Sequence, residues 1–128
     1  MFDRISMIGL GYIGLPTAAL FAARGIEVIG VDVSPKVVET INAGKIHIVE
    51  PELDGIVHKA VTDGNLRATL KAEPAEAFVI AVPTPFKEDY EPDLSYIQSA
   101  ANMIAPVLKA GDLVVLESIK AIAATEKM

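Results

Sequence analysis

Three glycines, at positions 9, 11 and 14, stand at Gly-x-Gly-x-x-Gly spacing directly after a short apolar run. Gly9 permits a tight turn out of a strand, Gly11 lets a pyrophosphate approach the backbone, and Gly14 lets a helix pack close to the sheet. The helix N-terminus offers N–H groups and a partial positive charge, so phosphate binding here needs no basic residue. The spacing predicts a dinucleotide-binding loop, and we include Tyr12 and Ile13 in it.

An acidic residue, Asp32, ends a second apolar run about 20 residues after the last glycine. Its carboxylate can accept hydrogen bonds from the ribose hydroxyls and would repel a 2′-phosphate, so NAD is favoured over NADP. Lys36 lies four residues further on, where it could bind the cofactor and soften that preference. The alternative is a structural glycine turn and an unrelated surface aspartate, but strand, loop, helix and acid occur together here.

The elements around these residues alternate in type. Apolar runs predict strands at residues 5–8, 27–32, 66–70, 78–82 and 113–116. Helical patterns cover residues 13–24, 35–44, 51–61 and 94–109. This alternation predicts an α/β fold, a Rossmann-like doubly wound parallel sheet with strand order 3-2-1-4-5 and a truncated second half. We expect a single domain over residues 1–128.

In such a sheet the chain diverges on either side of the first strand, which leaves a crevice at the carboxyl ends of the first and fourth strands. The glycine loop and Pro83-Thr84-Pro85 both fall at this crevice. Pro83 and Thr84 are therefore candidates for contact with the cofactor, and the alternative is a simple stop of the strand. Ser118, which follows the fifth strand, is another candidate, with a helix cap as its alternative.

The composition excludes several classes of function. The net charge of −6 and the scattered basic residues disfavour nucleic acid as a partner. No apolar run reaches the ~20 residues of a membrane-spanning helix. The chain has no cysteine, which fits a cytoplasmic location and leaves no thiol nucleophile. His47 and His58 have no partner at metal-ligand spacing, so we expect no metal site.

The sequence resembles the UDP-glucose/GDP-mannose dehydrogenase family over about residues 4–118 and again at 125–128. The segments that carry the resemblance are residues 8–16, 30–32, 41–44, 46–51, 81–86 and 117–118. The resemblance implies the NAD-binding domain of a nucleotide-sugar 6-dehydrogenase, which oxidises a C6 alcohol to a carboxylate for polysaccharide biosynthesis. Residues 46–51 and the Pro-Thr-Pro run are more similar to the branch acting on UDP-N-acetyl-D-mannosamine than to UDP-glucose dehydrogenases, which stay the alternative.

Two departures from the family pattern limit that implication. The family's catalytic lysine, asparagine and cysteine would lie beyond position 128, and residues 119–124 replace a threonine and a Pro-Val-Gly turn that the family usually has. We therefore expect a chain that binds NAD, meets a UDP-sugar substrate only together with further domains, and is inactive alone.

The residues by themselves leave two other readings open, a non-catalytic dinucleotide-sensing module and an interaction domain with a vestigial loop. The open edge expected beside the fifth strand also predicts a homodimer or other self-association.

Overall fold

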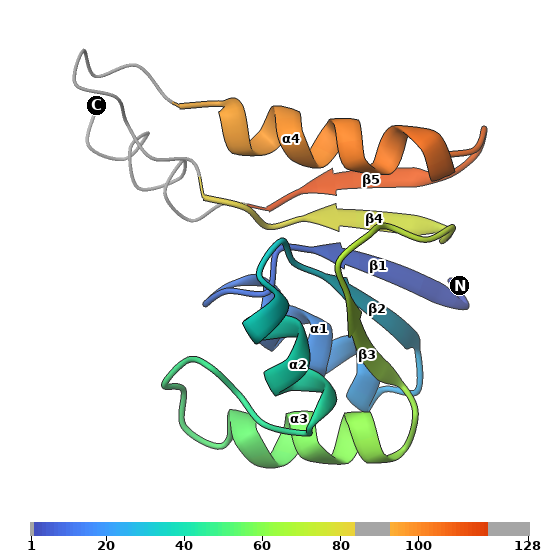
Figure 1. Cartoon of the computed structure of the whole chain (residues 1–128). Helices are drawn as coiled ribbons and strands as arrows, with labels where there is room; N and C mark the ends of the chain where they lie inside the picture. The colour runs from blue at the N-terminus through green and yellow to red at the C-terminus, as the bar shows by residue number, and fades with distance from the viewer. Residues whose placement is uncertain (1, 84–92, 118–128) are drawn as a thin grey trace, which may run out of the picture.

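Five parallel strands form one sheet in the order β3-β2-β1-β4-β5 (Figure 1). The structure is a computed structural model that describes residues 2–83 and 93–117. The strands are β1 Arg4–Ile8, β2 Glu27–Val31, β3 Leu66–Thr69, β4 Ala77–Ile80 and β5 Leu113–Leu116. The predicted strand order 3-2-1-4-5 is confirmed.

Helices cover both faces of this sheet (Figure 1). They are α1 Gly14–Ala23, α2 Pro35–Asn42, α3 Leu53–Thr62 and α4 Ser95–Ile104, the last continued by a 3-10 turn, η1 Ala105–Val107. The helices α1, α2 and α3 pack on one face, and α4 packs on the other. The doubly wound architecture predicted from the sequence is therefore confirmed.

Successive side chains along the strands point to opposite faces of the sheet and so pack into the two halves of the core. Met7 of β1 and Val79 of β4 pack with the α1–α3 layer, whereas Ile8 and Phe78 pack with α4. The buried side of α1 is mostly alanine, which lets its backbone approach the sheet closely. This close packing fixes the start of α1 beside the carboxyl end of β1, where the glycine loop lies.

Side-chain hydrogen bonds fix both ends of α2. Ser34 is its N-cap, and its hydroxyl accepts a hydrogen bond from the Val37 N–H at 3.3 Å. Asn42, in its last turn, donates to the Ala68 carbonyl at 2.9 Å and accepts from the Ala68 N–H at 2.8 Å. Asn42 therefore pairs with the backbone of the edge strand β3 much as a further strand would.

Two helix boundaries differ from those predicted. The helix expected over residues 94–109 ends at Ile104, because Pro106 cannot donate the next helical hydrogen bond and the chain continues as η1. The helix expected from residue 51 starts at Leu53, because Glu52 has φ +66°, a left-handed conformation that a helix cannot contain.

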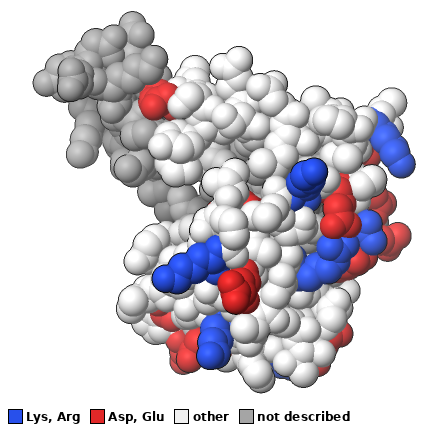
Figure 2. Space-filling view, in the orientation of Figure 1, with Lys and Arg blue, Asp and Glu red and all other residues white. Residues whose placement is uncertain are grey.

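Charged side chains are unevenly spread over the molecule. On the face seen in Figure 2, Lys and Arg lie among Asp and Glu over α2, α3 and the right-hand ends of the strands β1–β3, whereas the surface over α4 and β5 carries few charges. Among the described residues, ion pairs join Arg4 to Glu27, Lys59 to Asp63 and Arg67 to Glu73. None of the helices in the described ranges is both long and apolar enough to cross a membrane.

Candidate functional site

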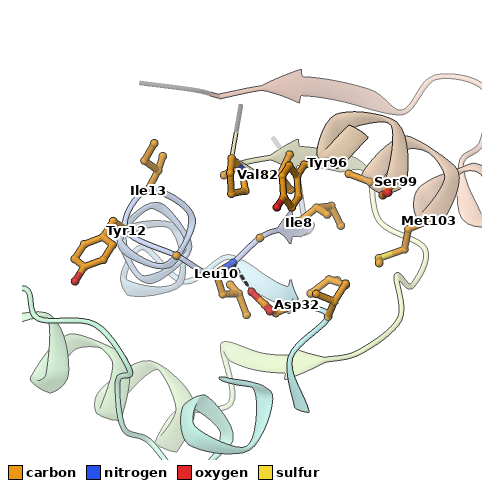
Figure 3. A pocket seen from close by; sticks show the side chains of 16 residues that line it. Ile8, Leu10, Tyr12, Ile13, Asp32, Val82, Tyr96, Ser99 and Met103 are labelled. Atoms are coloured by element: carbon orange, nitrogen blue, oxygen red, sulfur yellow. Dashed lines mark hydrogen bonds between the residues drawn. The ribbon is translucent and has the colours of Figure 1, made fainter. Parts of the chain in front are cut away.

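A cavity of about 520 Å³ lies at the carboxyl ends of β1, β2 and β4 (Figure 3). The glycine loop and the start of α1 form one wall, the end of β2 forms the floor, and α4 forms the opposite wall. Its lining is mainly apolar, and Asp32 is the only carboxylate among the described residues that line it. The cavity lies where the sequence placed the crevice.

The glycine loop is tightly packed at two positions and open at the third. Gly9 has φ +98°, and its N–H donates to the Val31 carbonyl of β2 at 2.8 Å. A Cβ at Gly14 would overlap the Gly9 carbonyl oxygen, so Gly14 is needed for the turn to close. A Cβ at Gly11 would meet no atom of the described residues within 4 Å other than those of its chain neighbours, so this backbone is open to a ligand.

The N-terminus of α1 adjoins this loop, and further along its first turn the Thr17 hydroxyl donates to the Glu117 carboxylate at 3.2 Å. The N-cap residue Ile13 makes no side-chain capping hydrogen bond, and the first turn contains no acidic residue. The first N–H groups of a helix have no intrahelical acceptor and carry a partial positive charge. An anion such as a pyrophosphate can therefore bind here, beside the open backbone at Gly11.

Asp32 lies directly after β2 and lines the same cavity. One oxygen of its carboxylate accepts from the Leu10 N–H at 3.1 Å and the other accepts from the Ser34 N–H at 3.0 Å. A carboxylate has about four lone-pair sites, so both oxygens can still accept from the hydroxyls of a ribose. The residues that lead into α1 and the acid thus line one cavity, as the phosphate and ribose of one nucleotide require.

The structure brings most of the predicted site residues together. Gly9, Gly11, Tyr12, Ile13, Asp32 and Pro83 line the cavity, and Gly14 lies directly behind the loop. Tyr12 is 65% exposed and extends on the side of α1 away from α4 (Figure 3).

Of the three remaining predicted residues, one lies away from the cavity and two are not described by the structure. Lys36 is exposed in the first turn of α2 and does not line it. Thr84 and Ser118 lie outside the described residues.

The sequence analysis did not identify the residues of α4 that form one wall of the cavity. Tyr96, Ser99, Ala100 and Met103 of α4 face the cavity opposite Leu10 and Asp32 (Figure 3). They follow the i, i+3, i+4, i+7 spacing of a single helix face. That spacing was visible in the sequence, but it is equally typical of a helix face that packs into a core.

The two histidines lie away from this cavity. His47 is exposed before α3, and His58 is exposed on α3 with its imidazole against Gly44. Within residues 2–83 and 93–117 no three metal-ligating side chains come close enough to hold an ion. The site's chemistry, in the part of the chain described, is that of anion and hydroxyl recognition.

Comparison with known proteins agrees with this geometry. The profile of the UDP-glucose/GDP-mannose dehydrogenase family, NAD binding domain, matches residues 3–128. A UDP-N-acetyl-D-mannosamine dehydrogenase of Yersinia pestis is 63% identical over 127 residues, 99% of this chain and 30% of that protein. An NDP-N-acetyl-D-galactosaminuronic acid dehydrogenase of Ralstonia nicotianae is 62% identical over the same share of each chain.

Solved structures show the same relationship. The UDP-N-acetyl-mannosamine dehydrogenase of Staphylococcus aureus has a TM-score of 0.88 and 32% identity, covering 98% of this chain and 33% of its own. GDP-mannose dehydrogenase from Pseudomonas aeruginosa has a TM-score of 0.83 and 37% identity, covering 90% and 28%. The chain spans about 30% of the length of the curated relatives it matches. It belongs to the UDP-glucose/GDP-mannose dehydrogenase family and forms that family's NAD-binding domain.

Proposed function

We propose that this chain holds the ADP portion of NAD for a UDP-sugar 6-dehydrogenase, within a domain that covers residues 1–128. The observation that carries the proposal is the open backbone at Gly11, which lies beside an uncapped helix N-terminus and shares a cavity with Asp32. The start of α1 would hold the pyrophosphate and Asp32 would accept from the adenosine ribose. Bound NAD supplies the hydride acceptor for oxidation of an alcohol.

Three further residues are proposed as contacts to the cofactor from their positions relative to the cavity. Pro83 lines the cavity at the end of β4, so Thr84 and Ser118 are proposed on the same side, toward the nicotinamide. Lys36 is proposed only as a peripheral contact to the adenosine ribose, because its side chain starts from the exposed side of α2.

For the complete enzyme we propose UDP-N-acetyl-D-mannosamine as the substrate. A relative 63% identical and another 60% identical, from Escherichia coli strain K12, carry that name. The relative named for an N-acetylgalactosaminuronic acid is 62% identical, which makes a UDP-linked N-acetylgalactosamine the second candidate. Both are N-acetyl sugars, so UDP-glucose is the less favoured alternative. Parallel turnover assays with the three UDP-sugars, on a longer protein that carries this domain, distinguish them.

A titration with NAD and NADP tests the binding proposal. NAD should bind and raise the melting temperature, since a ligand that binds only the folded state stabilises it. NADP should bind more weakly because Asp32 repels its 2′-phosphate. Asp32→Ala should weaken NAD binding by about 1–3 kcal/mol, the scale of hydrogen bonds to a charged group. Unchanged affinity in that variant would remove Asp32 from the site, and no binding by the wild type would reject the proposal.

We also propose that the 128-residue chain alone turns over no UDP-sugar, since it contains no cysteine to act as the nucleophile expected from the family. Sustained NADH production by this chain would contradict that. Two features support a non-catalytic role in isolation, an intact cofactor loop and the lack of any thiol.

The remaining proposals concern partners and location. Acidic and basic side chains alternate on the face shown in Figure 2 and the net charge is −6, which supports neither nucleic acid nor an anionic membrane surface as a partner. We propose a cytoplasmic location, where nucleotide cofactors are available, and self-association through the edge of the sheet formed by β5.

A further inference from the structure

Leu10, between the first two glycines, attaches the loop to the end of β2 through both its backbone and its side chain. Its N–H donates to the Asp32 carboxylate at 3.1 Å. Its side chain is fully buried and lies over Gly30 of β2, where a Cβ would come within 2.7 Å of a Leu10 methyl group. The preceding residue, Gly9, donates to Val31 of the same strand. Successive backbone and side-chain contacts thus hold the loop along the end of β2.

Asp32 is the side chain that completes this attachment. Its second oxygen accepts from the Ser34 N–H at 3.0 Å, so the carboxylate joins the glycine loop to the turn between β2 and α2. Hydrogen bonds from backbone N–H groups to a carboxylate are roughly twice as strong as neutral ones. Glycines have the largest conformational freedom of any residue, so a loop that contains three of them needs such fixed points.

We propose that Asp32 is a positioning residue for the phosphate loop, in addition to its contact with the ribose. This inference rests on the proposed binding of the ADP portion. By holding the Leu10 N–H, Asp32 sets the direction in which the backbone enters Gly11 and the first turn of α1. Binding of a phosphate should then depend on Asp32 even for a ligand that offers it no ribose hydroxyl.

Two variants separate this positioning role from charge. Both Asp32→Asn and Asp32→Ala remove the negative charge, and with it any repulsion of a nearby phosphate. Asn keeps one oxygen that can accept from the Leu10 N–H, whereas Ala keeps none. The Asn oxygen can accept from the Leu10 or the Ser34 N–H, so the difference between the two variants measures the hydrogen bond to the loop when amide exchange shows that Asn protects the Leu10 N–H.

The probe is 2′,3′-dideoxy-ADP, which has the base and phosphates of ADP without the ribose hydroxyls. We expect calorimetric titration to show about three- to tenfold weaker binding of this probe to Asp32→Ala than to Asp32→Asn, the effect of one hydrogen bond. Glu27→Gln, the same change at the other end of β2, is the control and should bind it as the wild type does. Equal affinities in the two Asp32 variants, with NAD binding intact in the wild type, would overturn this inference alone.

Amide hydrogen exchange tests the attachment without any ligand. The Leu10 N–H should exchange faster in Asp32→Ala than in Asp32→Asn, while the Gly9 N–H, bonded to Val31, should change little. Equal exchange at Leu10 would also overturn the inference. A wild type that binds neither NAD nor ADP would instead reject the proposed function, and the inference with it.

A third variant, Gly30→Ala, provides the test if Asp32→Ala does not fold. Its Cβ displaces Leu10 from the other side, and Gly30 itself lines no part of the cavity. We expect this variant to bind ADP and 2′,3′-dideoxy-ADP more weakly than the wild type does, by the same factor for both ligands. Unchanged affinity for both ligands in the folded variant would show that phosphate binding does not depend on the position of the loop, and would overturn the inference.

Discussion

Gly11 and Gly14 are two glycines of one loop that are required for different reasons. A Cβ at Gly11 would extend into open space, whereas a Cβ at Gly14 would overlap the Gly9 carbonyl. The first substitution should therefore affect the ligand and the second should affect the fold.

For Gly11→Ala we expect a free energy of unfolding within about 0.5 kcal/mol of the wild type, as for most changes that meet no neighbour. NAD affinity should fall at least about tenfold, equal to about 1.4 kcal/mol, because the methyl group occupies the space a phosphate needs. Urea unfolding and calorimetric titration measure the two effects. An undiminished affinity would place the pyrophosphate elsewhere.

For Gly14→Ala we expect a loss of about 1–3 kcal/mol in the free energy of unfolding, the usual cost of overpacking. Its NAD affinity should fall as well, since the loop must move to accept the new methyl group. A variant with wild-type stability would show that the close contact between Gly9 and Gly14 is relaxed at little cost.

At this scale the sequence predicted which residue types form the loop but not their mutual contacts. Asp32 was identified by its place after the second strand, and the structure adds that it binds the backbone of Leu10. The cavity-facing residues Ser99 and Met103 were missed because a helix face that lines a cavity has the same spacing as one that packs in a core. Lys36, Thr84 and Ser118 stay predictions.

At the scale of single elements, the start of α3 contains a strained residue. Glu52 has φ +66° at the N-cap position and makes no capping hydrogen bond. A left-handed conformation costs a non-glycine residue about 1–2 kcal/mol, and glycine avoids this cost. Glycine also loses more conformational entropy on folding, which offsets part of the gain in stability. Glu52→Gly should therefore raise the free energy of unfolding by up to about 1 kcal/mol in urea titration. A decrease would mean that the carboxylate stabilises the helix start by more than the strain costs.

The ion pair between β3 and the connection to β4 makes stability depend on pH. Two hydrogen bonds from the Arg67 guanidinium, at 2.6 and 2.8 Å, lower the pKa of Glu73 below its usual 4.5. A carboxyl whose folded pKa is lowered stabilises the protein above its unfolded pKa and loses that effect as pH falls through the folded value.

Glu73→Gln should accordingly cost less than about 1 kcal/mol at pH 7, because the pair is exposed to solvent. The cost should shrink as pH falls below the usual carboxyl range and through the lowered pKa of Glu73, where the wild type becomes protonated as well, and it should also shrink in 1 M salt. A series of unfolding curves from neutral to acidic pH measures it. A constant difference across pH would assign the effect to packing of the side chain.

Element boundaries depended on residues that the periodicity of apolar positions does not report. Ser34 and Pro35 marked the start of α2 correctly, because an N-cap followed by proline is a local signal. Pro106 ended α4 earlier than the apolar pattern suggested, and the left-handed Glu52 delayed α3. A backbone angle such as that of Glu52 is set by the packing of the chain around it, which the sequence shows only indirectly.

At the scale of the whole molecule, β5 is the least covered part of the sheet. Leu113, Val114, Val115 and Leu116 are 46%, 44%, 40% and 54% exposed, although alternate residues face opposite sides. Their strand is the last in the sheet order and lies in the nearly uncharged layer of Figure 2. An apolar, uncharged edge strand favours pairing with another chain.

We therefore expect the chain to self-associate as its concentration rises in sedimentation velocity experiments. Val115→Lys should shift the equilibrium toward the monomer, because a charge at a sheet edge opposes pairing. Leu70→Lys, the same kind of change beside the opposite edge of the sheet, should leave it unchanged. Monomeric behaviour of the wild type at high concentration would contradict the prediction.

The arrangement of the strands was the feature best predicted from the sequence. Alternation of strands and helices restricts a chain to parallel pairing with right-handed crossovers, which fixed the order 3-2-1-4-5 and hence the position of the cavity. The shape of the cavity could not be predicted in the same way, since it depends on how α4 packs across the sheet.

The central place of β1 also bears on how the chain is synthesised. β1 is made before both of its neighbours in the sheet. Its pairing with β2 can form early, but Ile5 meets Ala77 of β4 only after 72 further residues (77 − 5) have been made. Until then one side of β1 exposes unpaired backbone groups between two apolar faces. β4 ends this exposure of β1, whereas the last wall of the cavity is made later with α4, so protection of β1 from aggregation should precede binding competence during translation.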